Sequence, residues 1–195
     1  MRSIVQRISY LPVAALLFSG SWLVASPAAS AVGPPAAVQP ATAHNAEEAS
    51  RLLKEIRVIS EQLKRDSATL ESFRFSRMNW RSHVYQLNVA KEHVNEIGER
   101  LMKLQAIRNT SEPWQQKAID TIVPIGVNLA SQTNNAINLL NENRPQVKHP
   151  DYTERVTMLA DDAERMSHSV DAYLDLSAAQ NKLDSLQGKA AEIES

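Results

Sequence analysis

The stretch FRFSRMNWRSHVY, residues 73–85, separates two long runs in which apolar residues recur every three or four positions. The earlier run predicts a helix with an apolar seam, made up of Ala49, Leu52, Ile56, Ile59, Leu63, Leu70 and Phe73. The later run predicts a second helix and seam, made up of Leu87, Ala90, Val94, Ile97, Leu101 and Leu104. Continued through the stretch, the first register misses the second by one position. This slip predicts a corner at residues 76–79, with Ser76 or Asn79 as the cap of the second helix.

A corner lets the two helices turn back and bury their seams against each other, which a straight rod cannot do alone. The alternative is one bent helix of about 65 residues. Residues 45–97 contain no glycine or proline, so the stretch holds neither of the two usual helix breakers. The register slip is therefore the observation on which the prediction of a corner depends.

Two further helices follow the first two. Pro113, preceded by Asn-Thr-Ser, and Pro150 each fit the first turn of a helix. The four expected helices span about residues 45–75, 79–108, 112–143 and 150–193. With no strand signal, the sequence predicts an all-α fold, an up-and-down four-helix bundle with antiparallel neighbours. The last helix is the longest, and we expect its final turns to project past the bundle or to fray. They carry a second seam, made up of Leu176, Ala179, Leu183, Leu186, Ala190 and Ile193.

The N-terminal residues have the pattern of a secretory signal peptide. Arg2 and Arg7 precede an apolar run over residues 8–24, and Ala29 and Ala31 fit the small-residue cleavage rule. We therefore expect a signal peptide at residues 1–31, a Pro/Ala-rich flexible linker at 32–43 and the bundle at 44–195. An uncleaved anchor helix is the alternative, although proline and glycine interrupt the apolar run. The expected location is secreted or periplasmic, with no stable membrane insertion after cleavage.

Composition excludes several classes of function. The chain has no cysteine, which excludes zinc–thiolate sites, haem attachment through Cys-x-x-Cys-His and thiol catalysis. Its formal net charge is −1, whereas a nucleic-acid-binding domain is usually strongly basic. It also lacks the Gly-x-Ser-x-Gly, His-Glu-x-x-His and glycine-rich phosphate-binding motifs. The sequence therefore predicts a protein that is not an enzyme and does not bind nucleic acid.

A haem or metal ion bound in the bundle core is a further hypothesis. A b-type haem needs two axial ligands that face each other at one height, and the candidates are His83, His93, His168, Met102 and Met166. His83 and Met166 would be offset by roughly 18 Å along the bundle axis. The Glu-x-x-His motif of di-iron bundles is absent. We therefore expect no cofactor.

One face of the last expected helix carries an acidic stripe with a histidine in its middle. The stripe consists of Asp161, Glu164, His168, Asp171 and Asp175, spaced by three and four residues. Carboxylates and an imidazole on one face can form a weak divalent-cation site or dock a basic partner. The alternative is an ordinary solvated helix face.

The corner stretch itself has two interpretations. In the first, Phe73, Trp80 and Tyr85 plug the closed end of the bundle, and the arginines extend outward around them. In the second, the stretch is an interaction surface for an anion or an acidic partner, with an arginine stacked on tryptophan. The residues of that surface would be Arg74, Arg77, Trp80, Arg81 and His83.

Three classes of function fit these observations. The first is a secreted or periplasmic, non-enzymatic helical bundle that acts by protein–protein interaction or as an envelope scaffold. The second is a bundle that binds a metal, haem or small ligand. The third is a chaperone-like protein of the cell envelope. Architecture alone does not decide among them.

Overall fold

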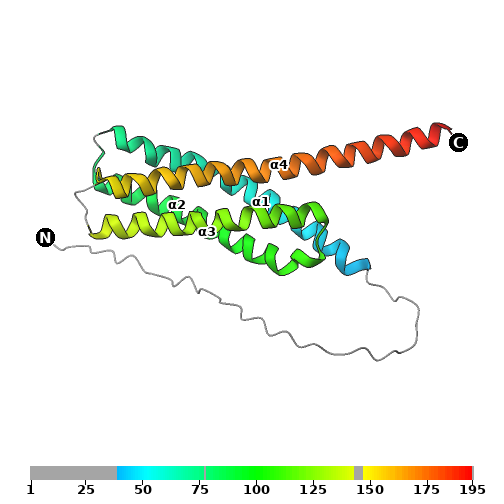
Figure 1. Cartoon of the computed structure of the whole chain (residues 1–195), viewed down its shortest axis with the longest axis horizontal. Coiled ribbons are helices and arrows are strands. Elements are labelled where there is room, and N and C mark those ends of the chain that lie inside the picture. The colour runs from blue at the N-terminus through cyan, green and yellow to red at the C-terminus, as the bar shows by residue number, and fades with distance from the viewer. Residues whose placement is uncertain (1–38, 77, 143–146, 195) are drawn as a thin grey trace, which may run out of the picture. The chain divides into compact units, whose positions relative to one another are not determined.

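The computed structural model describes residues 39–76, 78–142 and 147–194. Within these ranges the chain forms four α-helices and no strand (Figure 1). The helices are α1 (Gln39–Ser72), α2 (Trp80–Ile107), α3 (Pro113–Glu142) and α4 (Pro150–Glu194). Short 3₁₀ helices follow α1 and α2, namely η1 (Phe73–Phe75) and η2 (Arg108–Thr110).

Helix α1 begins earlier than the sequence pattern indicates. The expected signal peptide and residues 32–38 of the expected linker lie outside the described residues. Residues 39–43 of that linker are the first residues of α1. Pro40 lies in the first turn, where a proline costs no helical hydrogen bond because that N–H has no partner within the helix. A proline-rich composition therefore does not by itself exclude the start of a helix.

The four helices pack against one another in cyclic order. Helix α1 lies beside α2 and α4, and α3 lies beside the same two helices, whereas α1 and α3 barely touch. For the residues that the structure describes, the prediction of an all-helical fold of four packed helices is therefore confirmed.

The core consists of the seams that the sequence indicates. Every seam residue of α1 from Ala49 to Leu70 is buried, as is the whole α2 seam from Leu87 to Leu104. Helices α3 and α4 contribute buried apolar residues at the same spacing, among them Ile122, Leu129, Leu140, Val156, Leu159, Met166 and Val170. A fully buried aliphatic side chain stabilises a fold by about 1.5–3 kcal/mol relative to exposure, so these seams supply the driving force for packing.

The half-buried Asp66 interrupts the spacing of the α1 seam beside the fully buried Ser67, and α2 provides the partners of its carboxylate. The Asp66 carboxylate accepts a hydrogen bond from Gln86 Nε2 at 3.2 Å and lies 3.1 Å from His93 Nε2. A polar group in a packed interface is costly when it has no partner. Two partners on the facing helix explain how the seam tolerates Asp66.

Helix α4 continues beyond its packed part. All residues from Ala178 to Ile193 are exposed, and we call Leu176–Ile193 the α4 extension. Figure 1 shows the orange and red part of α4 running past the turn that joins α2 to α3. The second seam that the sequence indicates is thus helical but lacks a packing partner among the described residues.

Candidate functional site

The corner between α1 and α2 is built by one short 3₁₀ helix and one cap. The Asn79 side-chain oxygen accepts the backbone N–H groups of Arg81 at 2.9 Å and Ser82 at 3.3 Å, which is N-cap geometry. Ser76 instead donates its hydroxyl to the Phe73 carbonyl at 3.1 Å. Of the two candidate caps, Asn79 is therefore the residue that starts α2.

His83 lies inside the closed end of the bundle and not on its surface. Its side chain is 1% exposed, and its Nδ1 atom lies 2.9 Å from the Tyr152 hydroxyl on α4. The rings of Phe73 and Tyr152 meet the imidazole edge-on, at centroid distances of 5.3 and 5.5 Å. Burial lowers the pKa of His83 because it penalises the charged form, and burial raises the pKa of Tyr152 for the same reason. His83 is thus a neutral residue of the core.

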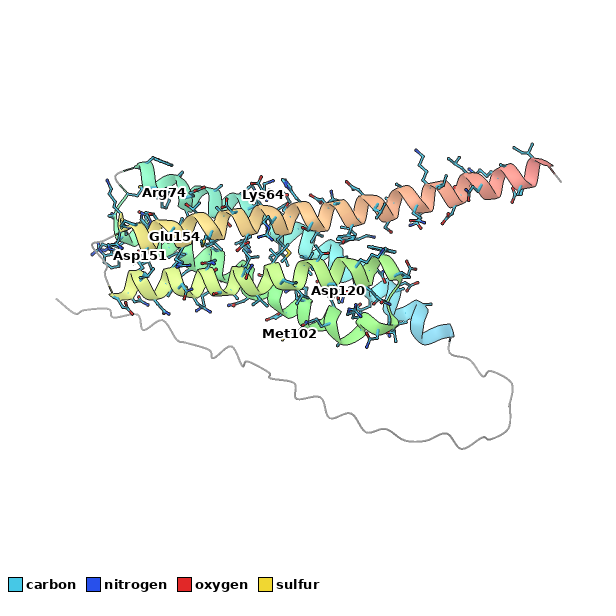
Figure 2. All side chains as sticks on the ribbon, in the orientation of Figure 1. Lys64, Arg74, Met102, Asp120, Asp151 and Glu154 are labelled. Atoms are coloured by element: carbon cyan, nitrogen blue, oxygen red, sulfur yellow. The ribbon has the colours of Figure 1, made fainter. Side chains whose placement is uncertain are left out.

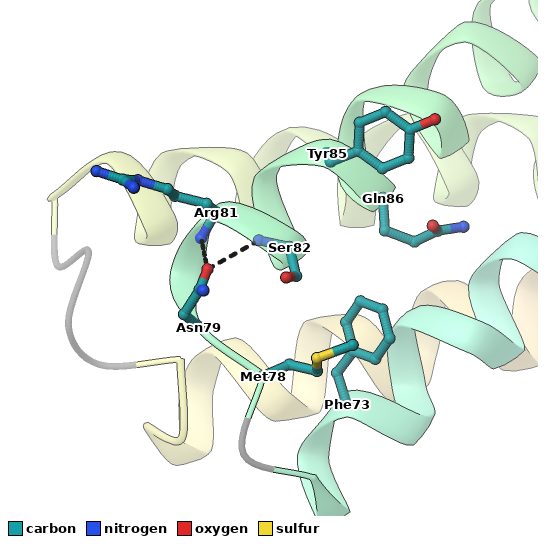
Figure 3. A pocket seen from close by; sticks show the side chains of 7 residues that line it. All are labelled: Phe73, Met78, Asn79, Arg81, Ser82, Tyr85 and Gln86. Carbon is teal, nitrogen blue, oxygen red and sulfur yellow. Dashed lines mark hydrogen bonds between the residues drawn. The ribbon is translucent and has the colours of Figure 1, made fainter.

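A hollow of about 430 Å³ opens beside the corner. Its lining comprises Phe73, Met78, Asn79, Arg81, Ser82, Tyr85 and Gln86. Figure 3 shows Phe73 and Met78 on one side of the hollow, facing Tyr85 and Gln86 of α2 on the other. In the same view the Arg81 side chain points away from the hollow, so its guanidinium lies outside it.

Apolar side chains around this hollow are unusually exposed. Phe75 is 86% exposed, Tyr85 70% and Met78 45%. We call the group Phe75, Met78, Arg81 and Tyr85 the corner surface. Exposed aromatic side chains that gather at one place mark interaction sites more often than single scattered ones do.

The prediction that Phe73, Trp80 and Tyr85 fill the closed end of the bundle is therefore only partly correct. Phe73 and Trp80 are half-buried, whereas Tyr85 is exposed, and His83 takes the interior position. The reason is helical periodicity. Because the inward positions of α2 include 83, 86 and 87, residue 85 lies on the outer face.

The predicted interaction residues do not form one surface. Arg81 lies over the Trp80 ring at 5.6 Å from its centroid. Arg74 turns toward α4, where its Nη1 atom donates to Glu71 at 3.0 Å and to the Thr157 hydroxyl. Figure 2 shows Arg74 at the same end of the bundle as Asp151 and Glu154.

Two predicted residues remain. His83 points inward, and Arg77 lies outside the described residues. The sequence analysis missed Met78 and Phe75, although their positions on either side of the turn signalled exposure.

The acidic stripe of α4 lies beside basic side chains of α1. The Arg57 Nε atom lies 2.6 Å from the half-buried Asp171 carboxylate, and Lys64 Nζ lies 3.4 Å from His168 Nε2. Glu164 lies 3.9 Å from the same His168 nitrogen. Asp161 and Asp175 are exposed. Across the described ranges, no three His, Asp or Glu side chains are grouped so that they could hold a metal ion.

Comparison with protein-family models, with curated proteins and with solved structures finds no match to this chain. In the part of the chain that the structure describes, no helix has the length and apolar character needed to cross a membrane.

Proposed function

We propose that this protein is an exported, non-enzymatic helical bundle that acts by binding another protein, as a scaffold or adaptor of the cell envelope. The observation that carries the proposal is the corner surface. Three of its residues, Met78, Arg81 and Tyr85, line one hollow, and a second exposed aromatic side chain, Phe75, lies in the same turn. Tyrosine, phenylalanine, methionine and arginine are the residue types enriched at the centres of protein interfaces.

The chemistry of the corner surface also indicates what the partner offers. Phe73, Met78 and Tyr85 give the hollow apolar walls, which suit an apolar side chain of a partner segment. Arg81 is exposed and points away from the hollow, so a carboxylate elsewhere on the same partner segment can pair with it. We infer that the corner surface binds a segment with an apolar side chain and a nearby acidic group.

We further propose that the four helices alternate in direction, as an up-and-down antiparallel bundle. Near the start of α1, Asn45 donates to Thr110 at 2.8 Å, and Gln115 donates to the Ala46 carbonyl at 2.8 Å. At the corner, His83 meets Tyr152 near the start of α4. These contacts support an arrangement in which each connection returns the chain along its neighbour, so the corner lies at one end of the bundle.

Export rests on the N-terminal sequence. We propose that residues 1–31 are removed as a signal peptide and that the rest of the chain is secreted or periplasmic, without stable membrane insertion. The proposal includes no catalytic residue, no resident cofactor and no nucleic-acid partner. The acidic stripe of α4 is assigned to solvent contact and to ion pairs with α1, such as Asp171 with Arg57.

A photo-crosslinking amino acid tests the interaction in the producing cell. Benzoylphenylalanine at position 85 replaces a tyrosine of similar shape, so the fold should tolerate it. We expect a discrete adduct with one other protein, and we expect Arg81→Glu to reduce its yield at least about tenfold, since loss of a charge pair at an interface typically costs more than 1.4 kcal/mol.

The matched control places the same crosslinker at Val127, an exposed apolar residue of α3. No specific adduct is expected there. Equal adducts at positions 85 and 127, or an adduct at 85 that Arg81→Glu leaves unchanged, would show that the corner surface is not the binding site.

A further inference from the structure

The α4 extension presents an apolar stripe that the bundle does not cover. The stripe repeats at alternating intervals of three and four residues: Leu176, Ala179, Leu183, Leu186, Ala190 and Ile193. Leu183 and Leu186 are each more than half exposed. Figure 2 shows no other helix beside the side chains of the extension. A seven-residue apolar repeat on an unpaired helix is the pattern of a two-stranded coiled coil.

This stripe faces the opposite way from the core seam of the same helix. At roughly 100° per residue, the buried positions from Val156 to Val170 and the exposed positions from Leu176 to Ile193 point about half a turn apart. The change of phase falls between Val170 and Ala179, where three three-residue steps follow one another through Tyr173 and Leu176. A longer α1 or α3 would therefore not cover the stripe, because both pack on the other side of α4.

A second copy of the chain can cover it without a clash. If two extensions pair through their stripes, each bundle lies on the outer side of its own α4, away from the other bundle. Further toward the bundle, the same register reaches Ser169 and Arg165, which are polar. Pairing therefore ends near Leu176, where the packed part of α4 begins.

The stripe is matched to itself in size. In a parallel, in-register pair, each leucine meets a leucine and each alanine meets an alanine. Large side chains therefore face large ones and small side chains face small ones along the whole pair. An antiparallel pair with Leu183 opposite Leu186 matches sizes equally well. Size alone therefore favours a second copy but leaves its direction open.

The flanking charges distinguish the two directions. In the antiparallel pair, Lys182 lies beside Lys189 of the second copy, and symmetry repeats this like-charge contact. In the parallel pair, Lys182 lies beside Gln187 of the second copy and Asp175 beside its Gln180. We propose that the α4 extension is the dimerisation element of this protein and pairs in parallel with the extension of a second copy.

Helix stability provides an independent reason for a partner. Every residue of the extension from Ala178 to Ile193 is exposed, and Gly188, a poor helix former, lies among them. An isolated helix of about 15 residues is marginal in water, whereas continuity with the packed part of α4 removes the cost of nucleation. Pairing then supplies the side-chain burial that keeps the extension helical.

Light scattering after gel filtration of the full chain tests the dimer. We expect a mass of two chains for the wild type and of one chain for Leu183→Gln combined with Leu186→Gln. The control Ser185→Gln changes the outer face of the same helix and should stay dimeric. Both altered leucines lie outside the core, so circular dichroism should show an intact bundle. A wild-type chain that is monomeric would overturn the proposal. It would do so even if a helix of another protein were found to bind the stripe.

Cysteine cross-linking tests the direction, because the chain contains no cysteine. In a parallel pair Ala190 meets Ala190, so Ala190→Cys alone should form an interchain disulfide under mild oxidation. Asn181→Cys, on the outer face, should not. In an antiparallel pair, two copies of residue 190 stand roughly 16 Å apart along the axis, which is too far for a bond. Cross-linking only between Ala179→Cys and Ala190→Cys chains would contradict the parallel arrangement.

Discussion

At the scale of single residues, the burial of His83 could be predicted from the sequence, but its contact with Tyr152 could not. Its place on the α2 seam was predictable from helical spacing, and that seam position is buried. Its partner was not predictable, because Tyr152 lies far along the chain and reaches His83 only through the packing of α4. The outward direction of Tyr85 follows from the same spacing, because the inward positions of α2 are 83, 86 and 87.

His83 should make stability depend on pH. Burial lowers its pKa in the folded state, so the unfolded state binds more protons as the pH falls below about 6.5. The free energy of unfolding should therefore decrease as the pH falls from 7.5 to 5, with a slope of at most about 1.4 kcal/mol per pH unit from this group. Chemical denaturation at several pH values measures the slope.

Two variants test whether His83 causes this pH dependence. His83→Gln keeps a group that can hydrogen-bond to Tyr152 but does not titrate, so it should reduce the slope. Val127→Gln alters an exposed residue that carries no titratable group and should leave the slope as in the wild type. A slope that survives His83→Gln would mean that another group causes it.

At the scale of helices, the apolar seams were predictable, because a core-facing helix must present apolar residues every three or four positions. The interruption at Asp66 could be seen in the sequence, but its partners on α2 could not, since they depend on how α1 and α2 lie against each other. The start of α1 at Gln39 was missed because a proline in the first turn looks like a linker residue. The direction of Arg74, toward Thr157, likewise depends on α4 as a neighbour.

The cap of α2 gives a prediction at this scale. Asn79→Ala removes the acceptor of two backbone N–H groups and should lower the free energy of unfolding by about 1 kcal/mol. Ser76→Ala removes a hydroxyl that bonds within the turn and should stay within about 0.5 kcal/mol of the wild type. Urea denaturation of the two variants decides between them. If Ser76→Ala lowered the free energy of unfolding more than Asn79→Ala, then Asn79 would not be the cap of α2.

At the scale of the whole molecule, the two proposed surfaces have separate tasks. The corner surface lies where α1 turns into α2, and the α4 extension carries the stripe assigned to a second copy. A parallel dimer would present two corner surfaces, which strengthens binding to a partner with two matching segments through effective concentration. Variants of one surface should leave the assay for the other unchanged.

Export makes its own prediction for the whole chain. If cleavage follows Ala31, the exported protein should begin at Val32, because Ala29 and Ala31 occupy the small-residue positions of the cleavage site. Intact-mass measurement of the protein recovered from the periplasm or the medium checks this directly. A membrane-bound species that retains residues 1–31 would instead support an uncleaved anchor.

The central claim is that the chain turns back at the corner and that α1 and α2 pack side by side. Spin labels at Glu47→Cys and Lys103→Cys test it, because both positions are exposed and the chain has no other cysteine. An excess of unlabelled chain suppresses signals between copies. If α1 and α2 are folded back on each other, the two spin labels should lie about 20 Å apart. This distance combines a helix spacing of about 10 Å with the lengths of the two label side chains. A distance near 80 Å, the length of roughly 56 residues in one continuous helix, would contradict the claim.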